Sequence, residues 1–225
     1  MKTTRGEFAV LNNAIVTIVK IDQQLKQLSG AAYEVIKIIN GIPLFFDKHY
    51  ERLLETINKG NINYCPDKIV LLNNIKELCE KNNLQQGNIE ISVAPNFSLV
   101  RFIPHFYPTF SGYESGVKTK CYYAERVNPN AKLKNIGLRK KINKYLKKNN
   151  LYEVILTNKQ GYMTEGSRSN MFFIDKHNTL YTAPDNQILK GITRDVVIRI
   201  CESMDLQIVK KQLKKNMLKD IDSAF

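Results

Sequence analysis

Two apolar runs with Asn-Gly between them are the feature that most constrains the fold of this chain. Residues 32–46 are rich in Ile, Val, Tyr and Phe, and Asn40-Gly41 divides them into two segments. Asn-Gly suits a two-residue hairpin turn because both residues tolerate a positive φ. The sequence therefore predicts two antiparallel strands joined by a tight turn.

Helical and β-rich patterns follow in the rest of the first half. A helix is predicted from Asp47, as its N-cap, to Gly60, because apolar residues recur there at helical spacing. A second amphipathic helix is predicted over about residues 67–82. The stretches 88–93 and 98–102 are typical of strands.

A connector rich in Pro and Gly predicts the domain boundary. Residues 104–116 lack periodicity, and a regular pattern resumes at Val117. We therefore expect an α+β fold with a smaller N-terminal α+β domain over residues 1–110 and a C-terminal domain over residues 111–225.

The second half is predicted to alternate strands with two helices. Strands are expected at 119–125, 153–157, 170–174 and 179–182, with a turn at 158–161, and helices at 136–148 and 192–204. Thr193 is the expected cap of the last helix.

The net charge of +13 raises the question of a nucleic-acid partner. Basic residues occur in nearly every segment and form no single block. The densest run, residues 138–148, has Leu138, Ile142, Tyr145 and Leu146 at helical spacing, so its lysines fill the opposite face of a helix. We predict neither a nucleic-acid nor a membrane partner.

The cysteines and the apolar runs predict a cytoplasmic protein. Cys65, Cys79, Cys121 and Cys201 lie far apart without a CxxC pair, which favours reduced, buried thiols over a disulfide framework or a metal site. The N-terminal stretch has no apolar run of a signal peptide, and no 18 apolar residues follow one another.

The most specific motifs lie in two blocks of the second half and in three short elements of the first. They are Thr164-Glu165-Gly166 with Ser169-Asn170, then Gly191-Ile192-Thr193-Arg194, and upstream Tyr33-Glu34, Asn40-Gly41 and His49-x-x-Arg52-Leu53. In this order they resemble the class IV (fold type IV) aminotransferases, the family of branched-chain aminotransferase, D-amino acid aminotransferase and aminodeoxychorismate lyase. The resemblance covers nearly the whole chain. It implies a two-domain fold with pyridoxal 5′-phosphate in the cleft between the domains.

The resemblance also implies a catalytic lysine that carries the cofactor, 32 to 34 residues before the Thr-Glu-Gly glutamate. Lys132 lies 33 residues before Glu165 and has Asn135 three positions later, as the family pattern requires. Lys140 and Lys141 are about eight residues too close to that glutamate. Lys132 is our choice, and Lys134 is the alternative.

Further cofactor-binding residues follow from the resemblance. Glu165 would hold a proton on the pyridine nitrogen, a charged pair that makes the ring a better electron sink. The remaining contacts expected are Arg52, Gly191, Ile192 and Thr193 to the phosphate, Leu189 against the ring, and Ser167 and Asn170 beside them. Simpler interpretations stay open: a turn residue for Glu165, a helix cap for Thr193 and a surface cation for Arg52.

The function implied is transfer of an amino group from an amino acid to a 2-oxo acid by a homodimer. Aminodeoxychorismate lyase and a cofactor-free binding protein are the alternatives. Family members continue past Phe225 into a Thr-Gly-Thr loop, so the resemblance implies a C-terminal domain shortened at its end, with weakened cofactor binding. The D-amino acid subgroup has a tyrosine where Lys26 stands and an arginine where Ile103 precedes His105, so the sequence selects neither the amino donor nor its stereochemistry.

Overall fold

The computed structural model describes residues 4–225, which form two compact units of mixed helix and sheet. Unit 1 runs to Tyr107 and includes Ala131–Ile136; unit 2 consists of Pro108–Asn130 and Gly137–Phe225. The α+β class is confirmed. The domain boundary expected between residues 110 and 111 stays a prediction, and it would assign residues 131–136 to the second half.

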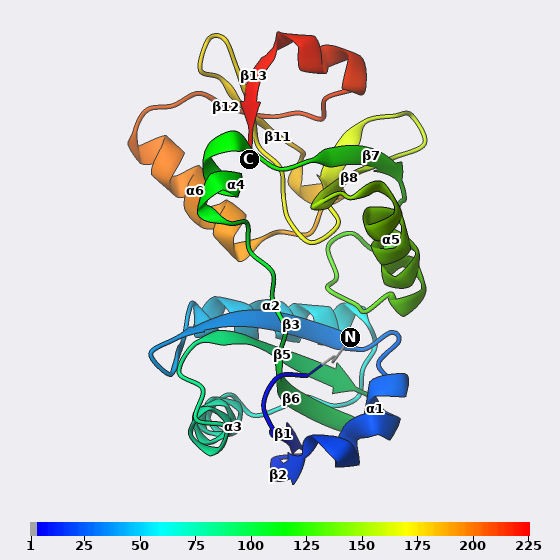
Figure 1. Cartoon of the computed structure of the whole chain (residues 1–225), viewed down its shortest axis with the longest axis vertical. Helices are drawn as coiled ribbons and strands as arrows, with labels where there is room; N and C mark the ends of the chain where they lie inside the picture. Colours follow the sequence, from blue (N-terminus) through cyan, green and yellow to red (C-terminus); the bar gives the residue numbers. More distant parts are fainter. Residues whose placement is uncertain (1–3) are drawn as a thin grey trace. The chain divides into compact units, whose positions relative to one another are not determined.

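Unit 1 is built on a six-stranded sheet in the order β2-β1-β6-β5-β3-β4, with every neighbouring pair antiparallel (Figure 1). Its strands are β1 (Phe8–Leu11), β2 (Ala14–Thr17), β3 (Ala32–Ile39), β4 (Ile42–Pro43), β5 (Gly87–Ala94) and β6 (Phe97–Ile103). The hairpin around Asn40-Gly41 is confirmed: both residues have positive φ, 51° and 75°. Its second strand is shorter than the apolar run, because the chain enters a helix at Phe46.

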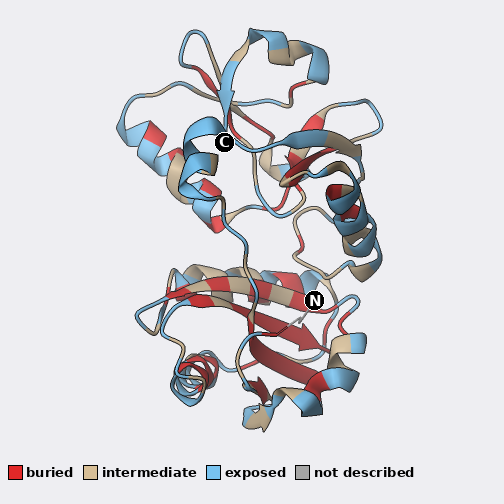
Figure 2. Ribbon diagram, viewed as in Figure 1, coloured by how far each residue is buried: buried red, intermediate tan, exposed pale blue. Residues whose placement is uncertain are grey.

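Helices α2 (Phe46–Lys59) and α3 (Lys68–Lys81) pack on the same face of this sheet. Asp67 caps α3 by accepting two backbone N–H bonds, as expected for a helix from residue 67. The prediction that Asp47 caps α2 is wrong: the N-cap is Phe45, and Asp47 lies in the first turn. Figure 2 shows that the inner strands of this sheet are largely buried.

The two faces of the sheet have separate cores. Side chains of α2 and α3 meet the inner strands in one cluster, which includes Leu53, Ile75 and Ile91. On the opposite face a smaller cluster joins β1 and β6 to the segment that holds the 3-10 helix η1 (Ile18–Ile21) and helix α1 (Asp22–Lys26). The end of the sheet formed by β1 and β6 is therefore covered on both sides.

Unit 2 contains two small sheets (Figure 1). One has the order β12-β11-β10-β13 and the other β7-β8-β9. The strands are β7 (Thr119–Tyr123), β8 (Glu153–Thr157), β9 (Met163–Gly166), β10 (Phe173–Asp175), β11 (Leu180–Thr182), β12 (Ile208–Lys210) and β13 (Ile221–Ala224). The strand predicted at 170–174 begins three residues later than expected.

The helices of unit 2 are α4 (Phe110–Ser115), α5 (Ile136–Asn149) and α6 (Ile192–Ser203), with 3-10 helices η2 (Asp185–Gln187) and η3 (Lys215–Asp220). α5 connects the parallel strands β7 and β8 and packs through Ile142 and Leu146, so the basic run forms its other face. Two expectations are corrected. The connector contains helix α4, and α6 is capped by Gly191, with Thr193 inside its first turn.

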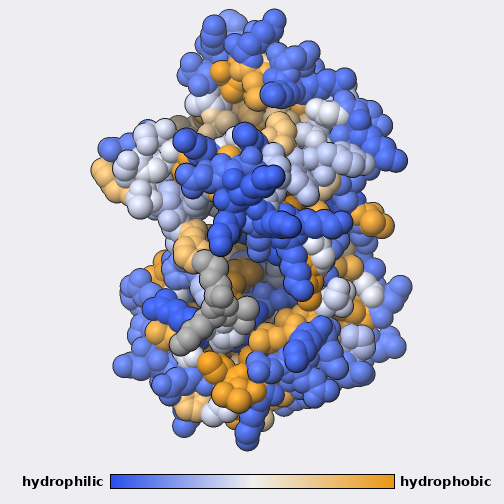
Figure 3. Space-filling view, turned by 45° about the vertical axis from the view of Figure 1, so that its right-hand side comes forward, coloured by the Kyte–Doolittle hydropathy of each residue, from blue (hydrophilic) through white to orange (hydrophobic). Residues whose placement is uncertain are grey.

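The surface and the cysteines complete the comparison with the sequence. Hydrophilic residues cover most of the visible surface (Figure 3). All four cysteines are free, but only Cys79 and Cys201 are buried; Cys65 is exposed and Cys121 is half-buried, which corrects the expectation of four buried thiols. No helix within residues 4–225 is long and apolar enough to cross a membrane. The first three residues of the N-terminal stretch, used to predict the location, lie outside the described residues.

Candidate active site

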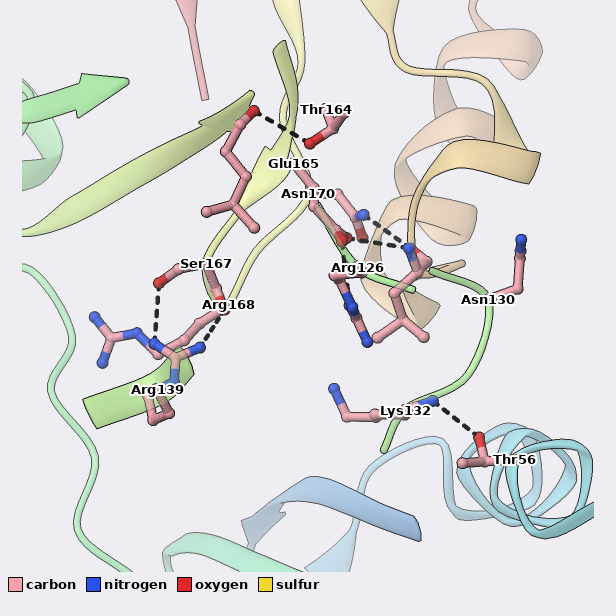
Figure 4. A network of polar contacts seen from close by, with 12 residues as sticks. Thr56, Arg126, Asn130, Lys132, Arg139, Thr164, Glu165, Ser167, Arg168 and Asn170 are labelled. Atoms are coloured by element: carbon pink, nitrogen blue, oxygen red, sulfur yellow. Dashed lines mark hydrogen bonds and ion pairs between the residues drawn. The ribbon is translucent and has the colours of Figure 1, made fainter. Parts of the chain in front are cut away.

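Glu165 is a buried carboxylate in strand β9, where the sequence allowed a turn. β9 pairs with β8, and the Thr164 hydroxyl donates to the Leu156 carbonyl at 3.1 Å, which fixes the strand beside its neighbour. The Glu165 side chain is 5% exposed. One carboxylate oxygen accepts from Arg126 Nη1 at 3.1 Å, and the other accepts from the Leu189 backbone N–H at 3.1 Å. Both oxygens are thus oriented by groups from other segments of unit 2 (Figure 4).

Arg126 and Glu165 also line a pocket of about 290 Å³ within unit 2. Its other described walls include Glu125, Asn158 and Asn186. The lining does not include the residues predicted to bind phosphate or to pack on the ring.

The segment before α6 is fixed by Asn170. The Asn170 side-chain amide donates to the Leu189 carbonyl at 2.9 Å. A Cβ on Gly191 would lie 1.9 Å from Asn170 Oδ1, far inside a van der Waals contact, so a larger residue here would displace the Asn170 side chain. Asn170 thus contacts the segment before α6, and the Leu189 N–H of that segment also donates to Glu165.

The start of α6 provides backbone donors. Gly191 is its N-cap, and no side chain among the described residues caps the helix there. The first N–H groups of a helix have no intrahelical acceptor, and the helix dipole favours an anion beside them. The start of α6 thus offers backbone N–H donors of the kind that bind anions, and phosphate binding by Gly191, Ile192 and Thr193 stays a prediction.

Ser167 belongs to a different network. Its hydroxyl donates to Glu153 Oε1 at 2.6 Å and accepts from Arg139 Nη1 at 3.0 Å, while Arg139 also donates to the Ser167 carbonyl. Glu153 is buried and accepts the Arg168 backbone N–H at 3.2 Å. Ser167 is therefore already hydrogen-bonded to protein groups in this structure.

In unit 1, Lys132 and Arg52 are linked through Thr56. The Thr56 hydroxyl accepts the backbone N–H of Lys132 at 3.2 Å and donates to the Arg52 carbonyl at 2.8 Å. The Lys132 ammonium lies 4.9 Å from the centre of the Tyr33 ring. The Thr56 side chain of α2 thus connects the backbone of Lys132 to that of Arg52.

Glu34 orients the Arg52 guanidinium. It is fully buried and accepts from Arg52 Nε at 2.7 Å, Arg52 Nη2 at 2.6 Å and His49 Nδ1 at 2.8 Å. Burial raises the pKa of Glu34, but the hydrogen bonds from Arg52 and His49 lower it more, so the pKa lies below its ordinary value. Glu34 of the first motif thus binds His49 and Arg52 of the second, so the two motifs contact each other in the folded chain.

Four residues whose side chains join these networks were missed in the sequence: Thr56, Arg126, Arg139 and Glu153. Arg126 is the one with a usable signal, since it is an arginine in a lysine-rich chain and lies six residues before Lys132. Its contact with Glu165 spans 39 positions and depends on the tertiary fold. Within residues 4–225, no cluster of side chains suits a metal ion.

Comparisons with known proteins show the family to which this chain belongs. The family model described as "Amino-transferase class IV" matches residues 31–225. The chain is 28% identical to the D-alanine aminotransferase of Bacillus licheniformis, covering 92% of this chain and 78% of that protein.

Solved structures share the fold. The branched-chain amino acid aminotransferase of Escherichia coli has a TM-score of 0.80 at 18% identity, over 98% of this chain and 81% of that one. A protein named as a candidate 4-amino-4-deoxychorismate lyase from Legionella pneumophila has a TM-score of 0.76 at 21% identity, over 89% and 79%. The chain belongs to the class IV aminotransferases.

Proposed function

We propose that this enzyme uses pyridoxal 5′-phosphate to transfer the amino group of an amino acid to a 2-oxo acid. The observation that carries the proposal is the buried, doubly oriented carboxylate of Glu165 in the family's Thr-Glu-Gly element. When bound, pyridoxal phosphate supplies an electron sink for the charge that develops at the substrate α-carbon.

The residues of this chain fit that cofactor. The uncapped start of α6 offers backbone N–H groups to the phosphate, and Thr193 adds a hydroxyl. Glu165 holds a proton on the pyridine nitrogen, because a carboxylate beside a cationic ring favours the charged form. The Leu189 side chain packs on the ring, and Asn170 keeps the Leu189 backbone in position.

Lys132 supplies the amine of the reaction. Its Nζ would hold the cofactor covalently, and as a free amine the same atom would accept and return the proton of the substrate α-carbon. Arg52 is the cation proposed for the phosphate; two of its donors face Glu34, which fixes the plane of the guanidinium. Ser167 is kept as a weaker candidate, since Glu153 and Arg139 already bind its hydroxyl.

A homodimer and a cytoplasmic location are part of this proposal. The dimer is supported by the family resemblance and the location by the four cysteines, which form no disulfide within residues 4–225. Sedimentation at micromolar concentration tests the dimer. An active monomer would contradict it.

The test of the function is a spectral titration followed by a donor screen. Purified protein is mixed with pyridoxal phosphate, and the cofactor's absorbance is followed as it becomes bound. L- and D-amino acids are then supplied with a 2-oxo acid acceptor, and the new amino acid is quantified. No spectral change at any cofactor concentration, with no product, would contradict the proposal.

Aminodeoxychorismate lyase activity is the second candidate, because the Legionella pneumophila neighbour shares the fold. A lyase releases pyruvate from aminodeoxychorismate and needs no 2-oxo acid acceptor. Pyruvate release without an acceptor, and no amino transfer in the donor screen, would favour the lyase.

A further inference from the structure

Two lysines of unit 1 lie side by side on one aromatic ring. The segment Ala131–Ile136 pairs antiparallel with the free edge of β3, through a bridge between Leu133 and Ala32. Leu133 packs into the core on the helix side. Because side chains alternate along an extended chain, Lys132 and Lys134 point to the other side. Their ammonium groups lie 4.9 Å and 5.2 Å from the centre of the Tyr33 ring.

The two ammonium groups differ in their partners. Lys134 Nζ lies 2.7 Å from Glu90 Oε1, and its side chain is 12% exposed. Lys132 lies close enough to Glu34 for its charge to lower the pKa of that carboxyl, but no ion pair within 4.0 Å joins it to a carboxylate among residues 4–225. The two amines are thus distinguished by the direct contact of Lys134 with Glu90.

Glu90 is itself held from three directions. The same oxygen accepts from Arg101 Nη2 at 2.8 Å and from the Ser92 hydroxyl at 3.4 Å. Glu90 is 8% exposed and Arg101 is 6% exposed. Burial raises the pKa of Glu90, but the charges of Lys134 and Arg101 lower it more, so its pKa lies below the ordinary value. The carboxylate therefore stays ionised at neutral pH. Burial lowers the pKa of Lys134, and the charge and hydrogen bond of Glu90 oppose that shift by favouring the ammonium form.

Backbone hydrogen bonds also fix residues 132–134 against residues 30–33. Lys134 donates its N–H to the Ala31 carbonyl at 2.9 Å and accepts from the Gly30 N–H at 2.9 Å, while the Lys132 carbonyl accepts from the Tyr33 N–H at 3.1 Å. With the backbone fixed, the choice between the two amines depends on their side-chain contacts.

We propose that Glu90 is a positioning residue, which binds Lys134 as a structural cation and so leaves Lys132 as the amine that takes the cofactor. This rests on the proposed function. Removing the Glu90 carboxylate would release a second amine beside the Tyr33 ring, where it competes for the same aldehyde.

The test is to identify which lysine is labelled by pyridoxal phosphate and borohydride. The lysine amine adds to the aldehyde carbon with loss of water; borohydride then delivers hydride to that carbon, and a proton from water goes to the nitrogen. Peptide mass spectrometry locates the resulting stable amine. The wild-type protein is expected to carry the label on Lys132.

Glu90→Gln is expected to lower the ratio of Lys132 label to Lys134 label by about tenfold or more. This factor corresponds to the free energy of one charge-assisted hydrogen bond. Glu90→Asp should restore part of the ratio. Glu55→Gln is the matched control, because this exposed carboxylate binds Lys59 on the surface; its labelling should equal that of wild type. An unchanged ratio in a folded Glu90→Gln variant would overturn the proposal.

A second variant keeps the test valid if Glu90→Gln does not fold. Lys134→Arg preserves the cation for Glu90 but removes the amine, so labelling of Lys132 is expected to persist. Loss of all label in Lys134→Arg, or a wild-type label on Lys134, would overturn the assignment while leaving the proposed function intact. A wild-type protein that carries no label on any lysine would instead contradict the proposed function.

Discussion

Replacing Gly191 with alanine tests how the start of α6 is held. The new Cβ would lie 1.9 Å from Asn170 Oδ1 and 3.1 Å from its Cγ, so the Asn170 side chain must leave its place. Its hydrogen bond to the Leu189 carbonyl is then lost. A buried carbonyl without a partner costs about 1–3 kcal/mol, and Leu189 is buried. For a chain of this size, that predicts a fall in Tm of about 2–12 °C.

The assay is a double-mutant cycle on thermal unfolding, with Asn170→Ala as the second change. Asn170→Ala removes both the hydrogen bond and the atom that the new Cβ would strike, so Gly191→Ala should cost much less in that background. We expect a coupling of about 1–3 kcal/mol between the two sites. Weaker binding of pyridoxal phosphate should accompany the Gly191→Ala loss. If the two effects add within about 0.5 kcal/mol, close contact is not the reason for glycine at this position.

Three further predictions concern the site and the buried carboxylates. Lys132→Ala should lose the absorbance of covalently bound cofactor and about 10²–10⁴-fold in turnover, whereas Lys140→Ala should keep both; the reverse pattern would sink the assignment. Glu165→Gln should still bind cofactor but turn over about tenfold to about a thousandfold more slowly, because an amide cannot keep the pyridine nitrogen protonated. Near-normal turnover of this variant would show that Glu165 has only a structural role. Because the pKa values of Glu34 and Glu90 are lowered by folding, their contribution to the free energy of unfolding is present above the ordinary value of 4.5 and is lost as pH falls below it. Urea midpoints should therefore fall steeply in that acidic range, and less steeply in Glu34→Gln, while parallel curves for the two proteins would refute the linkage.

Local patterns in the sequence predicted the elements that depend on neighbouring residues. The Asn40-Gly41 hairpin and the helix capped by Asp67 are decided by backbone preference and by side chains within a few positions. The start of α6 at Ile192 was predicted correctly, but its cap was assigned to Thr193, which is a common cap by residue type. Gly191 takes that position through contact with Asn170, which is distant in the sequence.

The motif residues were predicted from the family pattern, while the groups that orient them were not. Glu165 was expected at its place in the chain, but strand β9 and the ion pair with Arg126 arise from packing between separate segments. The same holds for Glu90, a charged residue in an apolar strand pattern. Its reason becomes visible only when Lys134 and Arg101 are placed beside it. Side-chain partners of this kind leave no periodic signal in one sequence.

The chain order of the two units limits how this enzyme can be divided. Ala131–Ile136 belongs to unit 1, although the residues on both sides of it belong to unit 2. The polypeptide therefore passes from one unit to the other three times. If the gene were split after Tyr107, the first fragment would lack residues 131–136, and with them Lys132. The second fragment would carry residues 131–136 without strand β3, with which they pair. Neither half is a transferable module. Recombination between relatives should exchange the proposed catalytic lysine together with unit 1, as an inserted piece, if the hybrid is to fold.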